Sequence, residues 1–182
     1  YKIAYLLCNG YMPWNILALT FTNKAANEMK ERIAALVGEE KARMLNMGTF
    51  HSVFSRILRI EAASIGYTPQ FTIYDESDSR SLLKTIVKEM ELDDKTYKSA
   101  EVHKRISLAK NRIEKPADYE QSEAYRSYDS ASGMEKMPEI YARYQARLHQ
   151  ANAMDFDDIL LYTYILLYKN VELQRKYGER FK

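Results

Sequence analysis

The 182-residue sequence predicts an α/β protein that is mostly helical. Over residues 1–75, short apolar runs alternate with amphipathic segments, a pattern typical of strands and helices that build a parallel sheet. Beyond residue 75, apolar residues recur only at helical spacing. We therefore expect a parallel-sheet portion over residues 1–75, an all-helical portion over 76–153 and a last helical segment over 154–182.

Three short apolar runs in the first portion are predicted strands, at residues 16–21, 47–49 and 71–74. Helices are expected around them: one over residues 2–9 that Gly10 ends, one from Thr22 or Asn23 to Val37, and one from His51 or Ser52 that Gly66 closes. Three short strands make a small sheet, so we expect its remaining strands to lie outside this chain.

Four apolar stripes define the helices expected after residue 75, and the polar stretch 117–136 is expected to be a loop or short helices. Asp75 or Ser77 begins the first helix, Pro116 ends the second, Asp155 caps the fourth, and a short helix over 171–177 follows. The stripes are Leu82, Leu83, Ile86, Val87 and Met90; Val102, Ile106, Ala109 and Ile113; Ile140, Tyr141, Tyr144 and Leu148; and Phe156, Ile159, Leu160, Leu166 and Leu167.

Composition sets broad limits on the function. The hydrophobic content of 46% allows a buried core, and a net charge of +2 neither favours nor excludes a nucleic-acid partner. The single cysteine, Cys8, excludes an internal disulfide, is expected to be buried, and fits a reducing compartment such as the cytoplasm. The longest apolar run, 159–168, is about half the length that a membrane span requires, so no membrane partner is expected. The chain opens inside a helical pattern without Met, and we expect it to be a fragment.

Two predicted strand-to-helix corners carry hydroxyl, amide and imidazole groups. Helix N-termini at the carboxyl ends of parallel strands attract phosphate, because free backbone N–H groups and the helix dipole point the same way. These side chains could contact a nucleic-acid backbone, and Phe21 could stack on a base; alternatively they are ordinary helix caps with Phe21 in the core. The corners consist of Thr20, Phe21, Thr22, Asn23 and Lys24, and of Thr49, Phe50, His51 and Ser52.

Further polar clusters lie in the helical portions. The densest basic cluster comprises Lys104, Arg105, Lys110, Asn111 and Arg112, and is expected on the outer face of its helix, either solvated or in contact with duplex phosphates together with Ser107. The run Asp155-Phe156-Asp157-Asp158 is interpreted as a helix start rather than a divalent-metal site. No zinc pattern and no G-x-x-x-x-G-K-[ST] phosphate loop occurs, and we expect no catalytic and no metal-binding residue in this chain.

Four segments together resemble superfamily 1 DNA helicases of the UvrD/Rep/PcrA type. LALTFTNKAANEM (residues 17–29) resembles motif Ia, and GTFHSVFSRILR (48–59) resembles motif Ib. ISLAKNRIEKP (106–116) is similar to a stretch of the helical 1B subdomain, and MDFDDILL (154–161) to the segment that precedes the Walker B strand.

The resemblance implies part of a P-loop motor domain over residues 1–75, the 1B subdomain over 76–153, and a return into the motor domain over 154–182. It further implies an ATP- and Mg²⁺-dependent 3′→5′ DNA helicase whose Walker A and Walker B motifs lie outside this chain, so that the isolated chain is inactive and binds neither cofactor. Its partners would be single-stranded DNA, the junction of single and double strands, and the remaining helicase domains.

The resemblance also assigns roles to the residues in these segments. Single-stranded DNA would be bound by Thr20, Phe21, Thr22, Asn23 and Lys24, and its phosphates by Thr49, His51 and Ser52. Ser107, Lys110 and Asn111 would contact the duplex. Two alternatives stay open: a helical protein-interaction module in which the motifs serve only as helix caps, and part of a RecB-like helicase–nuclease.

Overall fold

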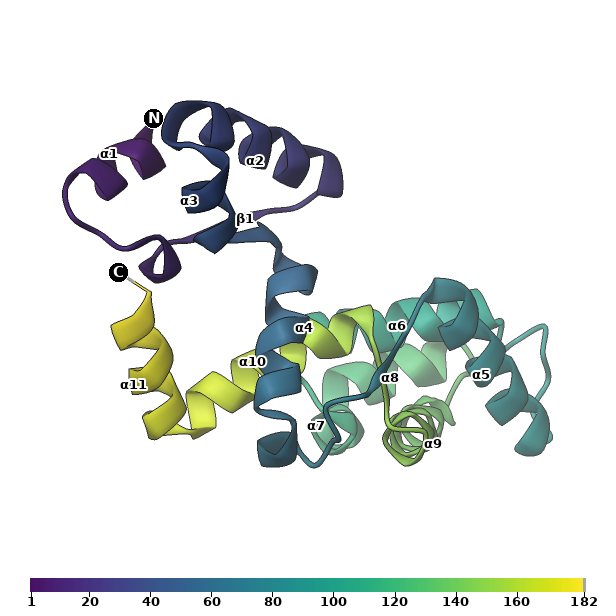
Figure 1. The fold of residues 1–182 in the computed structure, drawn as a ribbon. Coiled ribbons are helices and arrows are strands. Elements are labelled where there is room, and N and C mark those ends of the chain that lie inside the picture. The colour runs from purple at the N-terminus through teal and green to yellow at the C-terminus, as the bar shows by residue number, and fades with distance from the viewer. Residues whose placement is uncertain (182) are drawn as a thin grey trace. The chain divides into compact units, whose positions relative to one another are not determined.

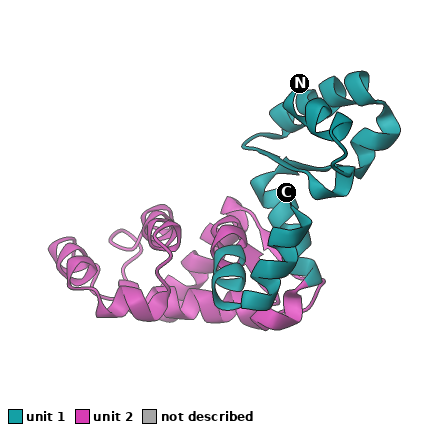
Figure 2. Ribbon diagram, turned by 90° about the vertical axis from the view of Figure 1, so that its left-hand side faces the viewer, with its two compact units in different colours: residues 1–60, 163–182 teal, residues 61–162 magenta. Residues whose placement is uncertain are grey.

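The computed structural model describes residues 1–181, which form two compact units (Figures 1 and 2). Unit 1 comprises residues 1–60 and 163–182, and unit 2 comprises residues 61–162. The mixture of many helices with short parallel strand pairs confirms the predicted fold class. The predicted division at residues 75 and 153 into functional parts remains a prediction.

Unit 1 contains one parallel pair of strands, β1 and β2, with helices around it (Figure 1). Leu17 of β1 pairs with Asn46 of β2, and the register continues to Thr20 opposite Thr49. In chain order its elements are α1 (Lys2–Cys8), the 3-10 helix η1 (Pro13–Asn15), β1 (Leu17–Thr20), α2 (Asn23–Val37), α3 (Glu39–Met44), β2 (Asn46–Thr49), α4 (Phe50–Ile60), the last residues of α10 (Phe156–Lys169) and α11 (Val171–Arg180).

Local sequence signals explain the limits of α2. The Thr22 hydroxyl accepts a hydrogen bond from the backbone N–H of Ala25, which confirms Thr22 as the N-cap. Gly38 ends the helix with a φ of 88°, a conformation that glycine adopts without strain. The inner face of α2, represented by Ile33, packs with Ile16 and Met47 into a small apolar core.

Unit 2 contains a second parallel pair of strands and a set of packed helices. Its elements are η2 (Ala62–Ile65), β3 (Thr72–Tyr74), α5 (Glu76–Glu89), α6 (Ser99–Asn111), α7 (Pro116–Gln121), α8 (Glu123–Ala131), α9 (Met137–Gln150), β4 (Ala153–Asp155) and the start of α10. Asp75 caps α5 through a reciprocal pair of hydrogen bonds with Asp78, as expected for a capping box.

The strand β4 corrects the prediction that residues after 75 are all helical. Thr72 of β3 pairs with Ala153 of β4, and Tyr74 pairs with Asp155. The predicted strand at residues 71–74 therefore exists, but its partner is a segment about 80 residues later rather than β1 or β2. A three-residue strand carries too little periodicity to be recognised, and its sequence runs directly into a helix start.

The core of unit 2 confirms most of the predicted stripes. Leu83, Ile86 and Val87 of α5 pack with Val102, Ile106 and Ala109 of α6 and with Ile140, Tyr141, Tyr144 and Leu148 of α9. Ile113 was expected in the same stripe but is exposed, because α6 ends at Asn111 and the chain turns there with a positive φ at Ile113. The polar stretch after Pro116 forms the short helices α7 and α8.

Two further findings concern the surface. Cys8 is exposed, so its predicted burial is wrong: it is the last residue of α1, a helix in which none of the residues is buried. Within residues 1–181, no helix is both long and apolar enough to cross a membrane.

Candidate nucleic-acid interface

The register of unit 1 brings the two predicted corners together. Thr20 and Thr49 are paired at the ends of β1 and β2, so the residues that follow each of them leave the strands side by side. The rings of Phe21 and Phe50 lie 5.2 Å apart between centroids, and Phe54 of α4 packs edge-on against Phe50 at 5.8 Å. The parallel pairing thus places two helix N-termini and a row of three aromatic rings at one edge.

Phe21 does not belong to the core, because 90% of its surface is exposed. Among residues 1–181, Phe50 is the ring partner of Phe21, and the exposed remainder of the Phe21 ring is open to a ligand. Next to it, the Thr20 hydroxyl donates to the Thr22 carbonyl, and Thr22 caps α2. Asn23 and Lys24 begin α2 and are exposed, and no described residue forms an ion pair with Lys24.

The second corner is more tightly closed than the first. Thr49 is nearly buried, and its hydroxyl accepts a hydrogen bond from the backbone N–H of Ser52, while the Ser52 hydroxyl donates to the Thr49 carbonyl at 2.9 Å. The helix therefore begins at Phe50, one residue earlier than the predicted start at His51 or Ser52. His51 is half-buried and Ser52 is exposed at the first turn of α4.

Phe50 belongs to the second predicted corner, but the sequence had given this residue no binding role. Its position directly after Thr49 repeats that of Phe21 after Thr20, so the signal was present once the two strands were placed in register. Gly48 contributes in another way: a Cβ there would lie 2.5 Å from the Ser52 oxygen. A side chain at this position therefore fits only if the Ser52 hydroxyl moves away from it.

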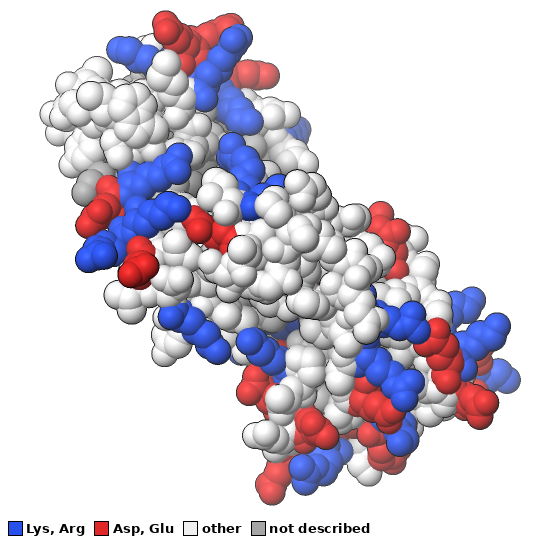
Figure 3. All heavy atoms as spheres, turned by 60° about the horizontal axis from the view of Figure 1, so that its bottom comes forward, with Lys and Arg blue, Asp and Glu red and all other residues white. Residues whose placement is uncertain are grey.

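Charge does not single out a site. On the face drawn in Figure 3, Lys and Arg side chains are interspersed with Asp and Glu, as the nearly balanced composition leads one to expect. On that face, a nucleic-acid interface is indicated by local geometry and not by a basic patch.

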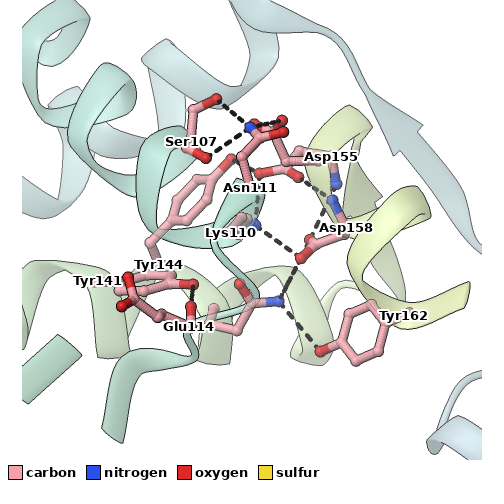
Figure 4. Close-up of polar contacts among 11 residues, drawn as sticks. Ser107, Lys110, Asn111, Glu114, Tyr141, Tyr144, Asp155, Asp158 and Tyr162 are labelled. Carbon is pink, nitrogen blue, oxygen red and sulfur yellow. Dashed lines mark hydrogen bonds and ion pairs between the residues drawn. The ribbon is translucent and has the colours of Figure 1, made fainter. Parts of the chain in front are cut away.

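Lys110 is not on the outer face of α6, where the sequence had placed it. Its side chain is 0% exposed, and its ammonium lies 2.7 Å from Asp155 and 2.8 Å from Asp158 (Figure 4). The Tyr144 hydroxyl also donates to Asp155, and the Gln145 amide donates to Asp158. We call these side chains the α10 ion cluster. Lys110 was expected to point its charge toward solvent, but within this cluster its ammonium is buried and cannot contact DNA.

Burial and pairing oppose one another in the α10 ion cluster. Burial lowers the pKa of the Lys110 ammonium, but the combined effect of the two carboxylates is larger than that of burial. The pKa of Lys110 therefore lies above its usual range. Burial also raises the pKa of Asp155, but the Lys110 charge and the hydrogen bonds that Asp155 accepts have a larger, opposite effect. The pKa of Asp155 therefore lies below its ordinary value. Burial and the neighbouring Asp155 charge raise the pKa of Asp158 to about 6 despite Lys110.

The segment Asp155-Phe156-Asp157-Asp158 begins a helix, as expected, and also binds a distant lysine. Asp155 accepts a hydrogen bond from the Asp158 backbone N–H at 2.8 Å, so the segment is a helix start as expected. The partnership with Lys110, 45 residues earlier, had no local signal in the sequence. Arg105, also expected on the outer face, is buried and pairs with Asp129 of α8.

Ser107 and Asn111 remain at the surface of α6, one turn apart. The Asn111 amide nitrogen donates to the Ser107 carbonyl at 2.8 Å and to Asp157 at 3.0 Å, with the Ser107 hydroxyl oxygen at 3.4 Å. Of the three predicted duplex-contact residues, the structure thus places two together at the surface and one inside.

The residues present do not fit Mg²⁺–ATP. The sequence contains no phosphate loop of the form G-x-x-x-x-G-K-[ST]. Within residues 1–181, His, Cys, Asp and Glu side chains form no group of three or more that could hold a metal ion.

Comparison with known proteins gives one consistent result. A family model described as the UvrD/REP helicase N-terminal domain matches residues 1–182. The chain is 39% identical to the ATP-dependent DNA helicase PcrA of Leuconostoc citreum and 40% identical to that of Staphylococcus aureus; each match covers 100% of this chain and 24% of the relative. It is 42% identical to the ATP-dependent DNA helicase UvrD1 of Mycobacterium bovis, with 100% and 23% covered. The chain spans about a quarter of the length of these curated relatives.

Proposed function

This chain belongs to the UvrD/Rep helicase family, and on that premise we propose that it supplies DNA-holding surface to an ATP-dependent 3′→5′ DNA helicase. In this proposal residues 1–75 and 154–182 belong to the first motor domain, and residues 76–153 form its helical 1B subdomain. Similarity over the whole chain to relatives named as DNA helicases supports the proposal.

Single-stranded DNA is proposed to bind at the joined corners of unit 1. The observation that carries this proposal is the open face of Phe21, held against Phe50 at the ends of two parallel strands. A base would stack on Phe21, because stacking on an exposed ring is worth about 1–3 kcal/mol and tolerates any base. Phosphates would be contacted by hydroxyl, amide, imidazole and ammonium groups of Thr20, Thr22, Asn23, Lys24, Thr49, His51 and Ser52.

Duplex DNA is proposed to meet Ser107 and Asn111 on α6, without Lys110. Both residues retain surface exposure, whereas the Lys110 ammonium is enclosed by two carboxylates. Few phosphate contacts are available, so affinity would be weak and would fall steeply with salt.

ATP and Mg²⁺ are proposed to bind parts of the helicase other than these 182 residues. Phosphoryl transfer needs a phosphate cradle, a metal-holding acid and a group that orients water. Because the residues of this chain do not supply that set, we propose that the chain alone neither hydrolyses ATP nor unwinds DNA. An assay of phosphate release with and without single-stranded DNA tests this, and DNA-stimulated release would refute it.

The central experiment is fluorescence anisotropy of labelled DNA titrated with this chain, using a single strand and a 3′-tailed duplex at two salt concentrations. The variant F21A should weaken single-strand binding about tenfold, which corresponds to one lost stacking contact. The matched control is Y5A, which removes an aromatic ring that is 67% exposed on α1 of the same unit.

The expected result is weaker binding by F21A with Y5A unchanged, and with circular dichroism of both variants equal to that of the parent. Equal binding by F21A and the parent would refute the stacking role. A folded parent chain that binds neither DNA would refute the proposed surface and favour the protein-interaction module.

A further inference from the structure

The side-chain amide of Asn111 has one allowed orientation. Its nitrogen carries two hydrogens: one points to a carboxylate oxygen of Asp157, and the other is shared by the Ser107 carbonyl at 2.8 Å and the Ser107 hydroxyl oxygen at 3.4 Å. Turning the amide over would place its oxygen against the Ser107 carbonyl and the Asp157 charge, and would lose both of those hydrogen bonds in exchange for one donor, the Ser107 hydroxyl. The nitrogen is therefore directed toward Ser107 and Asp157, and the amide oxygen is directed away from them.

This orientation acts on the Ser107 hydroxyl. A serine oxygen that accepts the Asn111 amide hydrogen must turn its own hydrogen elsewhere, and no described residue accepts that hydrogen. The hydroxyl is consequently available as a donor, as a DNA phosphate requires. Ser107 alone has three hydroxyl rotamers, so the contact with Asn111 narrows the direction in which it donates.

Asp157 is itself held by the helix start to which it belongs. Its neighbours Asp155 and Asp158 form ion pairs with Lys110 in the buried α10 ion cluster, and Lys110 is the residue next to Asn111. The cluster therefore fixes the last turn of α6 against the first turn of α10 (Figure 4). The Asn111 amide donates to Asp157 beside this cluster.

We propose that Asp157 is a positioning residue for duplex binding: it orients the Asn111 amide, which in turn directs the Ser107 hydroxyl toward a DNA phosphate. The inference rests on the proposed duplex contact of α6. Asp157 does not touch DNA in this arrangement, and its negative charge opposes phosphate, so its contribution is geometric.

Two substitutions at one position separate geometry from charge. D157N and D157A both remove the negative charge, but only asparagine keeps an oxygen that can accept from the Asn111 amide. Asp157 is half-buried in the first turn of α10 and outside the α10 ion cluster, so both variants should fold. S107A in the same chain removes the proposed phosphate donor and tests the duplex contact itself.

The measurement is the ratio of affinities for a 3′-tailed duplex and a single strand, at one fixed salt concentration. We expect S107A to lower the ratio, D157N to keep or raise it, and D157A to lie about fivefold below D157N, as for one lost hydrogen bond. If S107A lowers the ratio but D157A equals D157N, the positioning role is refuted while the duplex contact stands. If S107A leaves the ratio unchanged, the duplex contact fails, and the positioning role fails with it.

Discussion

Replacing Lys110 with methionine tests the α10 ion cluster at its centre. Methionine matches the length of the lysine stem but carries no charge, so K110M leaves the Asp155 and Asp158 carboxylates facing each other without a cation. In the parent chain the ammonium is within 2.8 Å of both, and the three side chains are at most 4% exposed. The substitution therefore isolates the loss of a buried cation.

The expected cost is large and depends on pH. Removing one partner of a buried ion pair costs about 3–5 kcal/mol, because the remaining charge is left without solvent or partner. Without Lys110 the pKa of Asp155 is no longer held below its ordinary value, and burial raises it, while the pKa of Asp158, already raised, rises further. A raised folded-state pKa favours the folded state at low pH and loses that contribution as pH rises. K110M should therefore be closer to the parent at pH 5 than at pH 8.

Urea unfolding followed by near-UV circular dichroism of the tyrosines reports on unit 2, where the fully buried tyrosines lie. With a slope of roughly 2 kcal/mol/M, the expected loss moves the midpoint by about 2 M. K104M is the matched control, because Lys104 is exposed on the same helix and should change stability by less than about 0.5 kcal/mol. A triple variant, K110M/D155N/D158N, should recover most of the loss, because no buried charge remains.

Two results would refute this reasoning. A loss below about 1 kcal/mol at pH 8 would mean that Lys110 is not enclosed as described. A loss of the same size at pH 5 and pH 8 would mean that the two carboxylates do not take up protons when the cation is removed.

Two further predictions concern single side chains. G48A should destabilise unit 1 by about 1 kcal/mol, because the new Cβ displaces the Ser52 hydroxyl from its hydrogen bond; tryptophan fluorescence in urea measures this, and an unchanged midpoint would contradict it. D158N should change the pH profile: the stability that the raised pKa of Asp158 contributes is present below about pH 4 and lost as pH rises to about 6. The parent's stability relative to D158N should fall across that window, and a constant difference would argue against the raised pKa.

Features set by neighbouring residues were predictable from the sequence. The cap at Thr22, the capping aspartate at Asp75 and the stripe from Ile140 to Leu148 each depend on groups within about one or two helical turns. The two corners were found for the same reason, since each is a short run followed directly by a helix start. Their meeting at one edge followed from a general property of parallel strands.

Long-range pairings were not predictable. The partner of β3 lies about 80 residues away, in a three-residue strand, and Lys110 was expected outside because basic residues usually are. Burial of Lys110 is tolerated only because Asp155, at the end of β4, and Asp158, in the first turn of α10, surround it. Nothing within reach of Lys110 along the sequence indicates those partners.

The sequence by itself therefore determined most of the helices, the caps at Thr22 and Asp75, the family and the identity of the surface-corner residues. Only the tertiary structure decided which polar side chains face outward, since that depends on charges and packing brought together from distant segments. In the structure, Lys110 is buried and does not lie on the proposed DNA surface. Phe21 is exposed and packs against Phe50, and the Asn111 amide donates to Asp157. The physical reason is that helix formation and capping are local, whereas desolvation of a charge is settled by everything that packs around it.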